Sequence, residues 1–131
     1  KMKYAALIGR ILFSLIFINS GMLHFTDYAV SYASSVGVPM PNILVSISGV
    51  MAILGGVSIM IGYKANWGAW LIVAFLIPVT LYMHRFWEIS DPVMQQIQFS
   101  MFMKNVAMLG GALLIAYYGS GPLSIDEGLR K

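Results

Sequence analysis

The chain of 131 residues contains no cysteine. This absence excludes disulfide bonds, thiol relays and thiolate metal sites from the chain, and it does not indicate a compartment. Charge is also scarce, because only 10% of the residues are Asp, Glu, Lys or Arg, against 59% hydrophobic residues. A soluble domain carries more charge and alternates apolar and charged faces along its helices. The composition therefore predicts a membrane protein.

Four apolar stretches are long enough, as helices, to cross a hydrocarbon core about 30 Å thick, which takes roughly 20 residues. They cover residues 4–23, 43–61, 67–83 and 97–118, and the second and third contain no charged side chain. We expect one all-α membrane domain over residues 1–131, a four-helix bundle with short loops. The first stretch has no cleavage site of a signal peptide, so we expect it to remain as an anchor.

Capping residues, prolines and glycines predict where the helices begin and end. Asp27 is expected to cap a short helix over residues 28–36, whose mixture of aromatic residues and serines is typical of a helix at the membrane interface. The other boundary signals are Pro41 and Gly62 around the second span, Asn66 as the cap of the third, and Asp91-Pro92 at the start of the fourth.

The distribution of positive charge predicts the orientation. If both termini lie on one side of the membrane, that side holds five cations, Lys1, Lys3, Lys64, Arg130 and Lys131. The loops on the other side contain Arg85 alone. Because positive loops stay cytoplasmic, we expect both termini inside and loops 25–42 and 84–96 outside, in the inner (plasma) membrane of a bacterium. The net charge of +3 then reflects topology and anionic lipid, with no nucleic acid as a partner.

Helical phase predicts which polar residues face the bundle interior. One narrow stripe on the first span consists of Arg10, Ser14, Phe17, Gly21 and His24. The fourth span has two polar faces, one with Gln96, Ser100, Lys104, Ala107 and Gly111 and the other with Gln98, Asn105 and Ala112. We expect one of these two faces to turn toward the bundle and the other toward a separate contact. Ser48, Ala52 and Gly56 form a small-residue stripe on the second span that favours close helix packing.

Lys104 is a lone cation in the fourth apolar stretch, where an uncompensated charge is costly. Topology places it near the outer third of the membrane, at about the level of several other polar residues. The candidate ligand-binding residues are His24, His84, Arg85, Trp87, Lys104 and Asn105. Arg10, near the inner boundary, and Asp91, at a helix start, are assigned structural roles.

A cationic pocket with histidines, lined by Phe86, Trp87 and Phe102, suits an anionic or quinone-like ligand that is held without a covalent bond. The alternative is that Lys104 pairs with Asp91 or with helix-end carbonyls, while the aromatic residues anchor the interface. Two histidines on separate helices, without a thiolate or carboxylate at fixed spacing, make a poor metal site, so we predict no metal. No serine is tied by spacing to a base, so the chain is not expected to be an enzyme on its own.

The third span contains Pro78, which removes a hydrogen bond to the carbonyl of Ala74 and is expected to bend the helix. Prolines are commonly tolerated in membrane helices, so the structural interpretation is preferred to a role in a pocket.

Taken in order, several short motifs make the chain resemble the DoxX family of small four-span membrane proteins over nearly its whole length. The motifs are Gly9-Arg10, Phe17, Ser20-Gly21, Gly55-Gly56, His84-Arg85-Phe86-Trp87, Asp91-Pro92, Phe102-Met103-Lys104-Asn105, Gly110-Gly111 and residues 121–126, GPLSID. The resemblance implies association with membrane redox complexes, since the family is named for a subunit of thiosulfate:quinone oxidoreductase. Many members carry a lysine at the position of His24 and an acid at that of Ala52, so an intramembrane acid facing Lys104 is missing here.

The resemblance and the polar residues together favour a non-catalytic or accessory subunit of a quinone-linked membrane redox complex, surrounded by lipid and by other membrane subunits. One alternative is a purely structural subunit of a respiratory or photosynthetic assembly. The other is a transporter of small solutes or lipids, which is least favoured because the second and third spans lack polar residues for a pathway.

Overall fold

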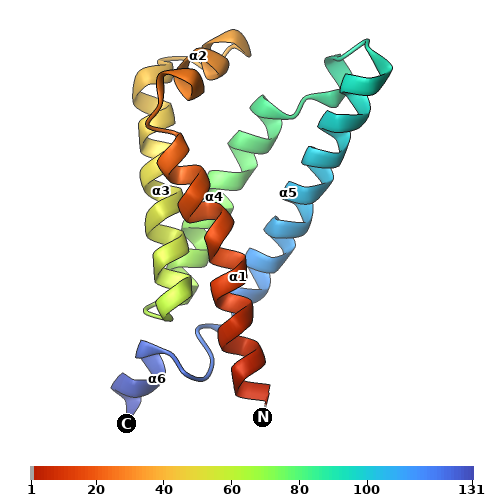
Figure 1. Ribbon diagram of the computed structural model, residues 1–131. Helices are drawn as coiled ribbons and strands as arrows, with labels where there is room; N and C mark the ends of the chain where they lie inside the picture. The colour runs from red at the N-terminus through yellow and green to blue at the C-terminus, as the bar shows by residue number, and fades with distance from the viewer. Residues whose placement is uncertain (1) are drawn as a thin grey trace.

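The computed structural model describes residues 2–131, and its long helices form a bundle (Figure 1). Within these residues, the helices long and apolar enough to cross a membrane are α1 (Met2–Leu23), α3 (Pro41–Ile61), α4 (Ala65–Met83) and α5 (Pro92–Tyr118). A short α2 (Asp27–Ser35) follows the first span, a 3₁₀ turn η1 (Phe86–Glu88) precedes α5, and α6 (Ile125–Arg130) ends the chain. No strand occurs in the described residues, so the prediction of an all-α membrane bundle is confirmed.

Several predicted helix boundaries are confirmed by the backbone and its hydrogen bonds. Pro41 lies in the first turn of α3, and Gly62 ends this helix with a left-handed φ of 69°. Asp91 caps α5 because its carboxylate accepts the backbone N–H of Met94 at 3.0 Å. The fourth long helix therefore begins at Pro92, before its apolar part, as the cap and proline predicted.

Two predicted caps are wrong, and geometry explains both. Asp27 is already the first residue of α2, and the hydroxyl of Thr26 accepts the backbone N–H of Ala29 at 3.2 Å instead. Asn66 lies inside the first turn of α4, where its side chain donates to the carbonyl of Ala116 at 2.9 Å. A capping side chain must precede the first turn of its helix, and neither residue does so.

Paired glycines bring neighbouring helices into close contact. A Cβ atom on Gly21 of α1 would lie 2.7 Å from the carbonyl oxygen of Gly49 on α3, and one on Gly55 of α3 would lie 2.9 Å from that of Gly68 on α4. Such distances are too short for any side chain, so these helices depend on glycine to approach closely. Ala52 is fully buried in the same seam, in agreement with the predicted packing stripe.

The helices do not close into a full ring. α1 lies along α3, α3 along α4 and α4 along α5, whereas α1 and α5 approach each other closely at few positions of the described chain. One such position is near the termini, where a Cβ on Gly111 would lie 3.1 Å from the ring of Phe13. Toward the α2 end, α5 leans away from α1 (Figure 1). The bundle is therefore open between α1 and α5 at the end that carries α2.

The predicted inward stripe of α1 is confirmed, because Arg10, Ser14, Phe17 and Gly21 are the buried residues of this helix. On α5 the buried residues are Asn105 and Ala112, so this face turns into the bundle and the face with Lys104 remains exposed. The fully buried Phe17, Ile59, Ile72 and Leu76 form the centre of the apolar core.

A polar clasp joins the ends of the bundle on the side of the termini, and we define it by Arg10, Lys64, Ser120, Leu123 and Asp126. Arg10 is 6% exposed and donates to the carbonyls of Ser120 at 3.0 Å and Leu123 at 2.6 Å. Its guanidinium is thus held by protein carbonyls, whereas snorkelling would have placed it among lipid headgroups.

The carboxylate of Asp126 completes the clasp. It accepts the backbone N–H of Lys64, with N–O distances of 3.0 and 2.9 Å, and the hydroxyl of Ser120 at 2.6 Å. Lys64 is the N-cap residue of α4 and has no capping side chain of its own. Asp126 therefore satisfies the amide of the N-cap residue of α4 from 62 residues away, while the amide of Ala65 donates to the hydroxyl of Ser120 at 3.3 Å. These hydrogen bonds, the one from the Lys64 amide first, hold the pKa of Asp126 below its ordinary value.

We predict that Arg10→Met destabilises the protein by about 3 kcal/mol, because buried carbonyls lose charge-assisted hydrogen bonds. Thermal unfolding in detergent measures the loss, and faster limited proteolysis after Ser120 would show that the clasp has opened. Lys3→Met is the matched control, since it removes an exposed cation from the same helix. Equal unfolding temperatures for Arg10→Met and Lys3→Met would contradict the structural role of Arg10.

We also predict that the stability contributed by Asp126 depends on pH. Because its pKa is lowered in the folded protein, its contribution is complete above the ordinary aspartate pKa and is lost as the pH falls through the lowered pKa. Wild type and Asp126→Asn should therefore differ in unfolding temperature at neutral pH, and the difference should shrink only as the pH falls below the ordinary aspartate pKa and through the lowered pKa of the folded protein. A difference that stays constant over this range would show that the carboxylate charge is not what matters.

Candidate functional site

A cleft of about 220 Å³ lies where α1 and α5 diverge. Its polar lining comes from three helices: Asn19 and Ser20 of α1, His84 at the end of α4, and Lys104 and Asn105 of α5. The remaining walls are apolar and include Phe17, Phe75 and Met108. The structure thus brings three of the predicted site residues, His84, Lys104 and Asn105, into one cleft in the membrane-spanning part of the bundle.

Lys104 enters this cleft without a carboxylate partner in residues 2–131. The ion pairs in this part of the chain join Arg85 to Glu88 and Lys131 to Glu127. The ammonium of Lys104 instead lies 3.6 Å from the sulfur of Met101, a weak acceptor on the previous turn. Asp91 caps α5, so the alternative in which Asp91 neutralises Lys104 does not describe this structure.

Both histidines are fixed as one tautomer by their Nδ1 hydrogen bonds. The Nδ1 of His84 lies 2.8 Å from Oε1 of Gln98, and the Nδ1 of His24 lies 2.6 Å from the carbonyl oxygen of Ser20. Because a carbonyl oxygen only accepts, each neutral ring carries its proton on Nδ1. Each Nε2 is then a hydrogen-bond acceptor.

Asn105 is held in place by a buried hydrogen bond. Its amide nitrogen donates to the hydroxyl of Thr80 on α4 at 3.0 Å, and the residue is 5% exposed. This bond joins α5 to α4 at the level of Lys104. Asn105 therefore contributes to helix packing and to the polar wall of the cleft at the same time.

Three predicted site residues lie outside the cleft, namely Arg85, Trp87 and His24. Arg85 donates to the carbonyl of Val36 at 2.7 Å and to that of Leu81 at 3.1 Å, so it ties the end of α2 to the end of α4. Trp87 packs against Phe86 and Phe102, with ring centroids 5.2 and 5.9 Å apart. The positions of Arg85 and Trp87 suit structural roles at the membrane surface.

His24 faces a second cavity, of about 290 Å³, that lies beneath α2. The walls shared by this cavity and the cleft are Ser20, Leu23, Val79 and His84. His24 and His84 both line this cavity, and His84 also lines the cleft.

Three residues of the cleft region were not predicted as site residues. Asn19 and Ser20 line the cleft, and Gln98 fixes the ring of His84. Asn19 could have been found as an amide within an apolar span. The partnership of Gln98 with His84 depends on how α4 and α5 pack, which no spacing within one helix reveals. No group of three or more His, Asp or Glu side chains that could hold a metal ion occurs in residues 2–131.

Comparison with known proteins gives a consistent picture. The DoxX family model matches residues 5–85. The inner membrane protein YphA of Escherichia coli is 32% identical, and the match covers 92% of this chain and 87% of YphA. The inner membrane protein YqjF of the same organism is 30% identical, and the match covers 95% of this chain and 92% of YqjF. The Surfeit locus protein 4 homolog of Drosophila melanogaster is 28% identical over 98% of this chain but only 42% of its own length. No solved structure matches the chain.

Substitutions of the neighbouring residues Lys104 and Asn105 should have different effects on the free energy of unfolding. We predict that Lys104→Met leaves the free energy of unfolding unchanged or raises it, because the ammonium has no carboxylate partner in the described chain and a cation in a membrane-spanning segment is costly. Asn105→Ala should cost about 1–3 kcal/mol, because it leaves Thr80 without its partner in a buried seam. Thermal unfolding in the same detergent measures both, and a large loss from Lys104→Met alone would refute the assignment.

Proposed function

We propose that this chain, which belongs to the DoxX family, binds the oxygen-bearing end of a quinone or similar amphiphile in the cleft between α1 and α5. The single observation that carries this proposal is Lys104, a cation that faces a cleft in a membrane-spanning region without a carboxylate partner in residues 2–131. A cation kept at such cost is most simply explained by a ligand.

The polar groups of the cleft match the oxygens of a quinone ring. The Lys104 ammonium donates charge-assisted hydrogen bonds, which are strong toward a carbonyl oxygen or oxyanion in a low-dielectric setting. His84 offers its Nε2 as an acceptor, because Gln98 holds the proton on Nδ1. The donor suits the oxidised form of the ligand, and the acceptor suits the hydroxyl of the reduced form.

We assign binding, without catalysis, to this site. The residues that line the cleft include neither a thiol nor a carboxylate, and the chain has no cysteine. Electrons for a quinone would therefore be exchanged with a partner protein. In this proposal the chain is an accessory subunit of a quinone-linked membrane redox complex.

We further propose that the protein lies in a bacterial inner membrane with both termini cytoplasmic and α2 on the outer side. The inner-membrane location is supported by the relatives YphA and YqjF, which are named inner membrane proteins. The orientation is supported by Lys3, Lys64 and Arg130 on the side of the termini, while Lys1 lies outside the described residues.

A purely structural accessory subunit is the second candidate, and one specific observation favours it. The α5 face that carries Gln96, Ser100 and Ala107 is exposed, although it lies on a membrane-spanning helix. Polar side chains at such positions suit a contact with another membrane helix. Purification in mild detergent without any co-purifying membrane protein would count against this candidate.

The proposal predicts that Lys104→Met weakens binding of a headgroup-only benzoquinone by at least about tenfold, the loss of one charge-assisted hydrogen bond. The measurement is labelling by a ring-azido benzoquinone in lipid nanodiscs, with the labelled peptides identified by mass spectrometry. Lys104→Arg should retain much of the labelling, and Lys64→Met, at the opposite end of the bundle, is the control. Equal labelling of wild type and Lys104→Met, or none of the wild-type cleft, would overturn the proposal.

A further inference from the structure

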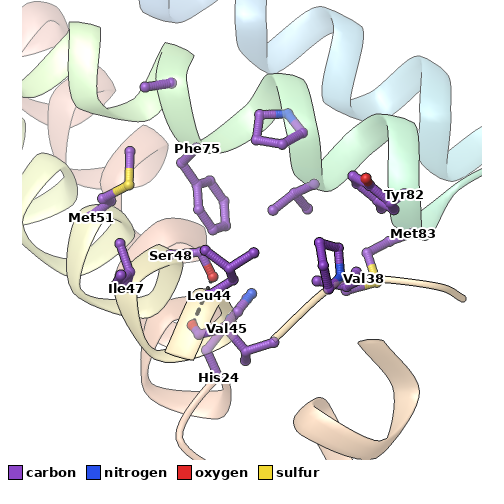
Figure 2. Close-up of a pocket in the computed structure, with 14 residues that line it drawn as sticks. His24, Val38, Leu44, Val45, Ile47, Ser48, Met51, Phe75, Tyr82 and Met83 are labelled. Atoms are coloured by element: carbon purple, nitrogen blue, oxygen red, sulfur yellow. Dashed lines mark hydrogen bonds between the residues drawn. The ribbon is translucent and has the colours of Figure 1, made fainter. Parts of the chain in front are cut away.

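An apolar pocket of about 220 Å³ opens between α3 and α4 at the end that carries α2. Figure 2 shows the labelled side chains around it, with Phe75 and Tyr82 from α4 facing Ile47 and Ser48 from α3, and His24 at one edge. The pocket also includes Ala74 and Pro78, the pair whose helical hydrogen bond the proline removes. Pro78, where a bend of α4 is expected, thus lies in the wall of this pocket.

The chemistry of this pocket suits a hydrocarbon chain. Polar side chains reach it only from His24, Ser48 and Tyr82, among the described residues that line it. The hydroxyl of Ser48 already donates to the carbonyl of Val45 at 2.7 Å, so it offers no free donor. The walls extend from Met83 to Ala74 along α4, about 13 Å into the membrane at the helical rise. A space with so apolar a lining disfavours a polar headgroup and suits a hydrocarbon chain.

The apolar pocket, the cavity beneath α2 and the polar cleft are neighbours that share walls. The apolar pocket and that cavity share His24, Val45, Val79 and Met83, and the cavity shares Ser20, Leu23, Val79 and His84 with the cleft. Val79 lines all three spaces. The three spaces therefore follow one another from Lys104, past both histidines, to the α3–α4 side of the bundle.

We infer that the apolar pocket holds the isoprenoid or acyl chain of the ligand whose polar end occupies the cleft. This inference rests on the proposed function and extends it to the class of ligand, which is an amphiphile with one long, flexible chain. The chain bends beneath α2 and leaves the bundle between α3 and α4, on the side opposite the entry of the headgroup.

Close packing, and not the hydrophobic effect, would select this chain. A chain that moves from lipid into the pocket stays in an apolar medium, so it gains only by better contacts. The direct route toward the membrane centre is narrowed because Phe13 packs over Gly111, where α1 and α5 meet. α2 covers the intervening cavity through Ala29 and Tyr32, and the hydroxyl of Tyr32 donates to the carbonyl of Met83 at 3.1 Å. A chain beneath α2 is thereby shielded from water.

Two photoreactive quinones test the inference in nanodiscs. One carries the azide on the ring, and the other carries a diazirine at the end of its isoprenoid chain. We expect the ring probe to label the cleft and the chain-end probe to label α3 and α4 residues of the apolar pocket, such as Ile47, Met51 or Ala74. Chain-end labels on lipid-facing residues of α1 and α5, or spread evenly around the bundle as an annular lipid would give, overturn the inference and leave the proposed function intact. If the ring probe fails to label the cleft, the proposed function fails first.

A pocket-filling variant gives a second, independent measurement. Ala74→Trp should weaken binding of the long-chain quinone about tenfold and leave binding of the headgroup-only quinone unchanged, whereas Ile77→Phe, on another face of α4, is the matched control. Equal binding of the long-chain quinone by Ala74→Trp and wild type would overturn the inference. The inference would also be overturned if Ala74→Trp lost binding of both the long-chain and the headgroup-only quinone while its unfolding temperature matched that of Ile77→Phe. Should Ala74→Trp not fold, Ser48→Leu fills the same pocket from α3 and is read by the same criteria.

Discussion

The clasp around Arg10 and Asp126 determines how the rest of the bundle is arranged. A buried guanidinium needs acceptors, and here two carbonyls near the end of α5 supply them, so α1 and the end of α5 are drawn together on the side of the termini. Asp126 adds the turn between α3 and α4 to the same cluster. Because the helices are fixed at this end, their divergence at the other end produces an open cleft. One polar cluster thus leaves the opposite end of the bundle free to open as the cleft.

The glycine seams divide the bundle into parts of unequal rigidity. α1, α3 and α4 approach so closely at Gly21–Gly49 and Gly55–Gly68 that no side chain fits between them. α5 has few buried residues and holds to α4 through the Asn105–Thr80 hydrogen bond and apolar contacts. Changes in the width of the cleft are therefore expected to come from movement of α5, which carries Lys104. His24 and His84, which adjoin α1 and α4, are expected to stay in place.

Much of the fold was predictable because membrane helices follow simple rules of length and phase. Hydropathy gave the spans, and a periodicity of 3.6 residues identified the buried stripe of α1 before any contact was known. The caps at Thr26 and Lys64 were missed, the first because two capping residues are adjacent and the second because Asp126 supplies the cap from far along the sequence. Of the candidate site residues, His84, Lys104 and Asn105 line one cleft, whereas Arg85 donates to the carbonyl of Val36 at the end of α2. Contacts between distant elements depend on packing, which periodicity within one helix does not contain.

The distance along the chain between Lys64 and Asp126 also has a consequence for biosynthesis. The amide of Lys64, the N-cap residue of α4, has no acceptor from its own segment, and the carboxylate that accepts it follows 62 residues later. While the ribosome is still making α5, this amide and the guanidinium of Arg10 both lack their partners at the membrane surface. The junction between the earliest and latest spans is completed only when residues 120–126 have emerged, so a nascent chain interrupted before that point cannot form the clasp.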